Sequence, residues 1–371
     1  MNVKQYPFYL KATVILFGII LLVYVLFNLQ DILIPVVFAM IFAILLNPLY
    51  SWFQKHKVPN NLSIIITLLL ALIVFGGVMY FLSTQIAKFS DALPVLKQKF
   101  GIMTTQFEQW VQSHFGITIQ KQVELVNEAL NNSKALAGST LSSALGTLGI
   151  IFLLPVYIYF FLFYKTLILN FLFEVFAEEN AKQVSEILNE TKSAIQSYMV
   201  GLLLEALIVA ALNSIALLIL GVKYAILLGI IGALLNVIPY IGGVIAIALP
   251  VLIATVTKDG YNTQIAIIIA YIIIQFIDNN ILVPKIVSSK VQINALISIL
   301  AVLLGAALWG VPGMFLSIPL IAIIKIIFDR IPDLKPWGKL LGYTIPTRHI
   351  GEIWSLRRNR SKPSLSDKNA S

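Results

Sequence analysis

Acidic and amide side chains stand inside long apolar stretches of this sequence. Asp278, Asn279 and Asn280 are consecutive and come at the end of an apolar run. A carboxylate beside two amides could bind a cation or the hydroxyl groups of a small polar solute, and a buried carboxyl group could also carry a proton. The alternative is that Asp278 caps the end of a helix and contacts water.

A second acidic residue lies deeper in an apolar run. Glu205 is followed eight positions later by Asn213, which falls on roughly the same helical face. An unpaired charge in the middle of a membrane helix costs ~3 kcal/mol, so Glu205 should be protonated, paired or facing a cavity. The two residues form either a polar stripe along a pathway or a hydrogen-bonded contact between helices. Glu205 and Asp278 are therefore our candidate ion-coupling residues.

Glycine and proline interrupt two charge-free segments, residues 224–257 and 291–324. Each is too long for one span of ~20 residues and too short for two spans with a turn. Lipid cannot satisfy the backbone groups freed at a break, so protein must cover them or water must reach them. We expect two re-entrant helical hairpins.

The hairpin tips supply the remaining candidate residues. Proline lacks an N–H group and glycine permits positive φ, so carbonyls freed there could coordinate a solute. Trp309 could act as a gate or as a packing anchor. The candidate binding or gating residues are Asn236, Pro239, Tyr240, Gly242, Gly243, Asp278, Asn279, Asn280, Trp309, Gly310, Pro312 and Gly313.

The composition is that of an all-α, polytopic membrane protein. Hydrophobic residues make up 59% of the 371 residues and charged residues only 12%. We expect about six through-spans, which with the two hairpins gives roughly eight to ten membrane helices. The expected spans are 12–30, 32–54, 58–87, 135–164, 206–222 and 261–277. The hairpins should enter from opposite sides, as in many secondary transporters.

The chain divides into five parts. Residues 1–83 contain the first three membrane helices, and residues 84–146 form a small extracytoplasmic domain of amphipathic helices, which is either a lid or oligomer contact or a cap packed on itself. Residues 147–198 contain the fourth span and a cytoplasmic amphipathic arm, which either links moving parts or lies on the membrane. Residues 199–328 are the core transport region, and residues 329–371 form a basic cytoplasmic tail.

The net charge of +9 is concentrated near the C-terminus. Basic residues next to membrane spans favour the cytoplasmic side, so we expect both termini in the cytoplasm and the tail against anionic lipids rather than nucleic acid. The chain has no cysteine, and its three histidines lie outside the expected spans. No phosphate-binding GxxxxGK[ST] motif is present, and Asp278 has no intramembrane aspartate or histidine partner. We therefore expect no enzyme, cofactor or metal site.

Several blocks resemble the autoinducer-2 exporter family of permeases. They are NVIPYIGG from Asn236, DNNILVP from Asp278 and GAALWGVPGMFLSIPLIAIIK from Gly305. The resemblance implies a multi-pass inner-membrane transporter, commonly oligomeric, with members linked to autoinducer-2 export and some branches to sodium or lithium exchange for protons. Where the family often has His-Pro, this chain has Asn294 and Ala295, so a proton role for that histidine is absent.

Two functions follow as expectations. The first is a secondary transporter, a permease or exporter, of a small polar or amphiphilic solute such as a molecule like autoinducer-2, with the opposed hairpins as gates. The second is a Na⁺(Li⁺)/H⁺ antiporter that uses Asp278 and Glu205. A scaffold without transport, acting through residues 84–146, belongs to a different class.

Overall fold

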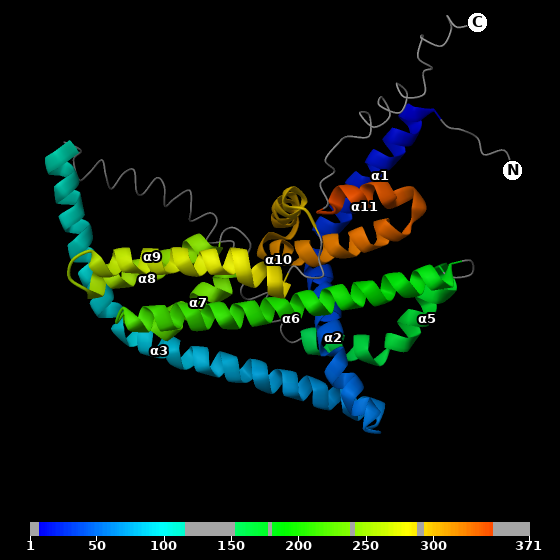
Figure 1. Ribbon diagram of the computed structural model, residues 1–371, viewed down its shortest axis with the longest axis horizontal. Coiled ribbons are helices and arrows are strands. Elements are labelled where there is room, and N and C mark those ends of the chain that lie inside the picture. Colours follow the sequence, from blue (N-terminus) through cyan, green and yellow to red (C-terminus); the bar gives the residue numbers. More distant parts are fainter. Residues whose placement is uncertain (1–6, 116–152, 177–179, 238–241, 288–292, 344–371) are drawn as a thin grey trace, which may run out of the picture.

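The structure is a computed structural model and describes residues 7–115, 153–176, 180–237, 242–287 and 293–343. Every named element in these ranges is a helix (Figure 1), which confirms the all-α class. Among the described residues, five helices are long and apolar enough to cross a membrane, or six if one bent pair counts as a single span. This agrees with the expected number of about six.

The first two helices follow one another without doubling back. The chain passes from α1 (Phe8–Asn28) through Leu29 into α2 (Gln30–Lys55), and together they cross the direction of α3 and α6 (Figure 1). The side chains of α1 are exposed almost throughout, although the helix is strongly apolar. An apolar helix without a buried face is suited to lipid or to another protein surface.

The third helix, α3 (Asn60–Phe115), is much longer than a span. Its candidate membrane span runs from Asn60 to Ser90, and the helix then continues past Pro94 with a change of direction (Figure 1). The amphipathic segment expected from residue 84 onward is therefore helical as far as Phe115, but it continues the helix of the third span instead of forming a separate helix. A proline removes one helical hydrogen bond, and here it lies inside the helix without ending it. The rest of the expected extracytoplasmic domain, residues 116–152, lies outside the described residues.

The expected arm and the fifth span form one helix. Helix Leu153–Phe163 and α5 (Lys165–Phe176) are bent by 61° at their junction. Next comes α6 (Ala181–Ile219), which contains no proline and only one glycine, so nothing in its sequence separates the polar half from the apolar half. This helix contacts α2, α7, α9 and α10 and forms the centre of the molecule.

In the range of the first expected hairpin the structure has two short helices. They are α7 (Ala225–Asn236) and α8 (Gly242–Thr257), and they pack against each other around a break at 237–241, of which 238–241 lie outside the described residues. Next, α9 (Asn262–Ile277) continues as a π-helix, η1 (Asp278–Val287).

The range of the second expected hairpin is covered by one long helical range, α10 (Ala295–Arg330), which has a break at Trp309 and Gly310. Gly310 has φ 61° and ψ −140°, a conformation that only glycine adopts without strain. Beyond Gly310 the chain reverses direction and packs against the first part of α10. The Ser317 hydroxyl there donates to the Ala301 carbonyl over 2.9 Å. The described chain ends with η2 (Pro332–Leu334) and α11 (Lys335–Leu341).

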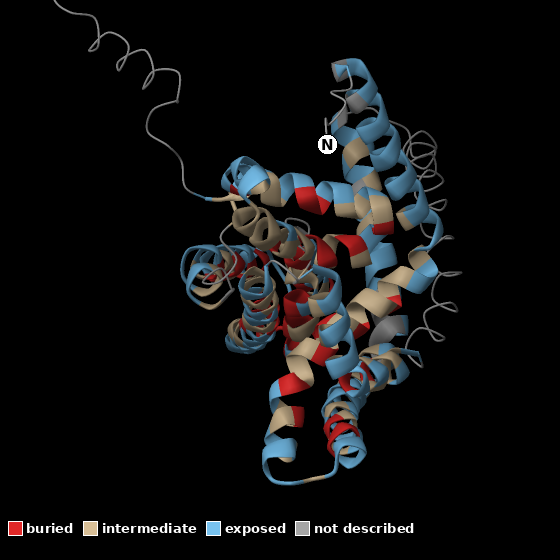
Figure 2. Ribbon diagram, turned by 90° about the vertical axis from the view of Figure 1, so that its right-hand side faces the viewer, coloured by how far each residue is buried: buried red, intermediate tan, exposed pale blue. Residues whose placement is uncertain are grey.

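Buried residues gather where these helices cross (Figure 2). One cluster joins Ile41 of α2 and Leu202 of α6 to Trp309 at the tip of the second hairpin, and Val237 at the first tip packs against the same cluster. Both breaks therefore reach one region beside the middle of α6.

Candidate functional site

A small polar cavity lies where α6, the first hairpin and α9 meet. Its volume is about 10 Å³, which is close to the space needed by one water molecule. Its lining residues are Val209, Asn213, Gly232, Asn236, Ala246, Tyr271, Ile274, Gln275 and Asp278. Five of the nine side chains carry polar groups, although the surrounding helices are strongly apolar.

Helical spacing explains how α9 and η1 contribute to the cavity. Tyr271, Gln275 and Asp278 are separated by four and three positions and so share one helical face. Gln264, seven positions before Tyr271, is buried on the same face. Tyr271, Gln275 and Gln264 were not among the residues predicted from the sequence, because the candidates were chosen at acidic residues and at glycine and proline breaks. A lone tyrosine and two glutamines at helical spacing in an isoleucine-rich span were the available signal.

Asp278 lies at the centre of the polar contacts. Its side chain is only 2% exposed, and Oδ2 accepts from Asn236 Nδ2 at 2.8 Å and from Gln275 Nε2 at 3.4 Å. Asp278 does stand at the C-cap of α9, as the alternative expected, but its burial does not agree with the expected contact with water. From Asp278 the chain continues as a π-helix, a form frequent at functional sites.

Glu205 and Asn213 are both buried on α6, as their spacing suggested. Asn213 lines the cavity. Glu205 does not line it, but its carboxyl group lies close enough to that of Asp278 to interact with it electrostatically. The two candidate ion-coupling residues are thus neighbours, although they stand 73 positions apart in the sequence.

Three buried oxygens of the lining residues have no hydrogen-bond partner among the residues that the structure describes. They are Asn213 Oδ1, Asp278 Oδ1 and the Tyr271 hydroxyl. A buried polar atom left unpaired costs about 1–3 kcal/mol. Three such atoms around one small cavity indicate a place for a water molecule, an ion or a polar group of a solute.

The first hairpin tip belongs to this site. Asn236 donates to Asp278, and Gly243 lies beside Gln275 and Asn236, where a β-carbon would stand 2.8 Å from Gln275 Oε1. A β-carbon at Gly242 would collide with the Leu235 carbonyl, so glycine there permits the close return of the chain. Pro239 and Tyr240 lie outside the described residues.

The second hairpin tip does not line the cavity. Trp309 is buried, and its Nε1 donates to the Leu26 carbonyl of α1 at 3.0 Å, so in this structure it is a packing anchor. Gly310 is exposed and Pro312 half-buried. A β-carbon at Gly313 would collide with the Gly305 carbonyl, which shows how closely the two arms pack.

Two further candidates also lie apart from the cavity. Asn279 and Asn280 are exposed, and Asn280 donates to the Phe276 carbonyl of its own helix at 2.8 Å. Asn294 accepts a hydrogen bond from the Ile297 N–H and caps α10. Within the described ranges, no group of three or more histidine or acidic residues is placed to hold a metal ion.

Comparison with known proteins places these features in a family. A sequence model described as AI-2E family transporter matches residues 13–333, most of the chain. The "Putative transport protein YrrI" of Bacillus subtilis (strain 168) is 25% identical over 308 residues, which cover 80% of this chain and 86% of that protein. The "AI-2 transport protein TqsA" of Escherichia coli (strain K12) is 25% identical over 304 residues, 81% of this chain and 86% of that protein. The "Putative permease PerM" of the same organism is 28% identical over 198 residues, 52% of this chain and 56% of that protein.

Proposed function

Because this chain belongs to the AI-2E transporter family and is a multi-pass membrane protein rather than an enzyme, we propose that it is a secondary transporter of a small polar or amphiphilic solute. The observation that carries this proposal is the buried polar cavity between α6, α7 and α9, with its unpaired oxygens. Burying polar side chains between apolar membrane helices costs free energy, so their presence here favours a functional role. A molecule like autoinducer-2 is one candidate solute, since TqsA bears that name as a transport protein.

The size of the cavity sets a condition on this function. A space of about 10 Å³ holds one water molecule but no organic solute. The helices around it must therefore separate during transport. The first hairpin is the element suited to move, because Asn236 at its tip contacts Asp278 through a single hydrogen bond.

In the same proposal the two hairpins are re-entrant and act as gates from opposite sides. Support comes from their tips, which meet one hydrophobic cluster beside the middle of α6. We place the protein in the cytoplasmic membrane with both termini on the cytoplasmic side, following the distribution of basic residues. The exposed apolar surface of α1 would contact lipid or a second copy of the chain.

A flux assay tests the transporter proposal. Purified protein is reconstituted into vesicles, and uptake of a panel of labelled small polar metabolites is measured with and without sodium and proton gradients. We expect at least one solute to be carried, and Asn213→Leu to lower its flux roughly 10-fold or more, because a polar contact worth ~1.5–3 kcal/mol is lost. Asp259→Asn, which removes an exposed acid outside the spans, should leave the flux unchanged. Equal flux in the two variants would contradict the assignment of the cavity.

The carboxyl pair supports a second candidate, a Na⁺(Li⁺)/H⁺ antiporter. Two ionised carboxylates in apolar surroundings repel each other, so a neighbouring Glu205 and Asp278 are suited to hold a proton or a cation between them. The unpaired Asn213 and Tyr271 oxygens could complete the coordination of a small cation, for which a cavity of one-water size is sufficient.

The two candidates differ in a double variant. If the protein exchanges sodium for protons, Glu205→Gln with Asp278→Asn should abolish pH-dependent sodium flux in vesicles, and the Asp259→Asn control should retain it. Unchanged sodium flux in the double variant would exclude antiport through these two residues. Solute flux that survives in this variant without any ion coupling would favour the first candidate alone.

A further inference from the structure

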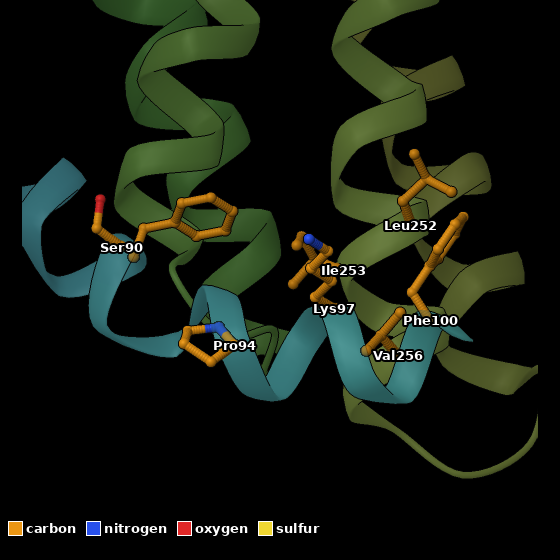
Figure 3. Close-up of a pocket in the computed structure, with 8 residues that line it drawn as sticks. Ser90, Pro94, Lys97, Phe100, Leu252, Ile253 and Val256 are labelled. Carbon is orange, nitrogen blue, oxygen red and sulfur yellow. The ribbon is translucent and has the colours of Figure 1, made fainter. Parts of the chain in front are cut away.

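A second and much larger cavity lies away from the polar site, between α3 and the C-terminal end of α8 (Figure 3). Its volume is about 690 Å³, within the ~300–1,000 Å³ typical of sites for small organic ligands. Six apolar residues line it, three from each helix: Phe89, Pro94, Phe100, Leu252, Ile253 and Val256. Only two lining residues, Ser90 and Lys97, carry polar side chains.

Both helices leave their apolar stretches at this level. The candidate membrane span of α3 runs from Asn60 to Ser90, and α8 ends at Thr257, directly before Lys258 and Asp259. Phe89 also packs edge-on against Tyr224 at the start of α7, with ring centroids 5.3 Å apart, so this end of α3 is held against the first hairpin. The cavity therefore straddles the boundary between lipid-facing and water-facing surface.

Lys97 gives the cavity a charge. Lys97 is one of the residues that line the cavity (Figure 3). No hydrogen bond or ion pair joins it to another described residue. Lys97 and Lys99 are both exposed, but only Lys97 lines the cavity.

We propose that this cavity binds an anionic phospholipid of the surrounding membrane. The acyl chain would lie along Leu252, Ile253 and the α3 aromatic rings, and the phosphate would bind Lys97 with Ser90 as a further hydrogen-bond donor. A water-soluble anion would gain nothing from the apolar walls, whereas a phospholipid matches both the walls and the cation. Because α8 is the second arm of the first hairpin, the bound lipid contacts an element of the proposed gate.

The test uses the full chain in phosphatidylcholine vesicles with a trace of photoactivatable lipid. The probes are phosphatidylglycerol and phosphatidylcholine, each with a diazirine in the acyl chain, and labelled peptides are mapped by mass spectrometry. We expect phosphatidylglycerol to label the peptides around residues 89–100 and 252–256 about fivefold more than phosphatidylcholine, the factor that corresponds to ~1 kcal/mol for one lysine. Lys97→Ala should remove this preference, and Lys99→Ala should keep it.

A second variant separates binding from general lipid contact. Leu252→Trp fills the cavity at a half-exposed position, so it should lower labelling by both probes at these peptides while leaving the fold intact. Equal labelling by the two probes in the unchanged protein, or equal effects of Lys97→Ala and Lys99→Ala, would overturn the proposal. Absence of labelling by either lipid at these peptides would also overturn it, since the cavity would then be covered by protein.

Discussion

The reversal of α10 at Gly310 can be tested directly, because the chain contains no cysteine of its own. We consider a double variant, Ala301→Cys with Ser317→Cys. In the structure the Ser317 hydroxyl lies 2.9 Å from the Ala301 carbonyl oxygen. If α10 were a straight helix, the same 16 positions would separate the two residues by ~24 Å at 1.5 Å per residue. The two residues are therefore in contact in one arrangement and more than four helical turns apart in the other.

Oxidation or a short bifunctional thiol reagent should join the two cysteines within one chain. Met314 lies between them, so cyanogen bromide cleavage puts the two cysteines on different fragments, 200–314 and 315–371, which stay together only when the link is present and separate on reduction. A matched control is Ala194→Cys with Ala210→Cys in α6, which has the same spacing in an unbroken helix and contains Met199 between the sites. The control pair should not link. Failure of the α10 pair under conditions that leave both thiols reactive would refute the hairpin, and with it the idea of two opposed breaks.

Three further predictions concern the contacts that hold the helices together. Gly242→Ala places a β-carbon against a backbone carbonyl of α7, so overpacking should lower the free energy of unfolding by about 1–3 kcal/mol and lower the melting temperature. Gly101→Ala, where nothing lies within 4 Å of the added β-carbon, should not lower it. Trp309→Phe keeps the ring but loses the hydrogen bond to the Leu26 carbonyl, and thermal unfolding in detergent should register a loss of ~1 kcal/mol; no loss would show that this contact is not formed in solution. Arg330→Gln removes ion pairs to Glu186 and Glu190, and because all three side chains are about a third or more exposed, the loss should be only ~0.2–1 kcal/mol and should vanish in high salt.

The sequence predicted the positions of the two breaks because glycine and proline act locally. Gly310 occupies a backbone region closed to other residues, and Gly242 permits a return that a β-carbon would block, so the residue types alone identified both turns. The pairing of Glu205 with Asn213 on one face of α6 was likewise readable from spacing. These are short-range properties of a helix.

Contacts between distant segments could not be read in the same way. Nothing in the sequence distinguishes Asp278, which is buried against Asn236, from Asn279 and Asn280, which are exposed, because the direction of each side chain depends on a π-helix that spacing rules do not anticipate. The sequence also did not predict that the cytoplasmic amphipathic arm and the fifth span form one continuous helix, α6, and the reason is related. A change from polar to apolar side chains was taken as a boundary, but without proline or a glycine pair the backbone continues through it.

The unbroken course of α6 has a mechanical consequence. At 1.5 Å per residue its 39 residues form a rod of ~58 Å, with the Arg330 ion pairs near one end and Asn213 near the other. A rod of that length works as a lever: a tilt of ~5° about its midpoint would carry each end by roughly 2–3 Å. Displacement of the charged end would thereby be transmitted to the polar cavity without any change in the helix itself.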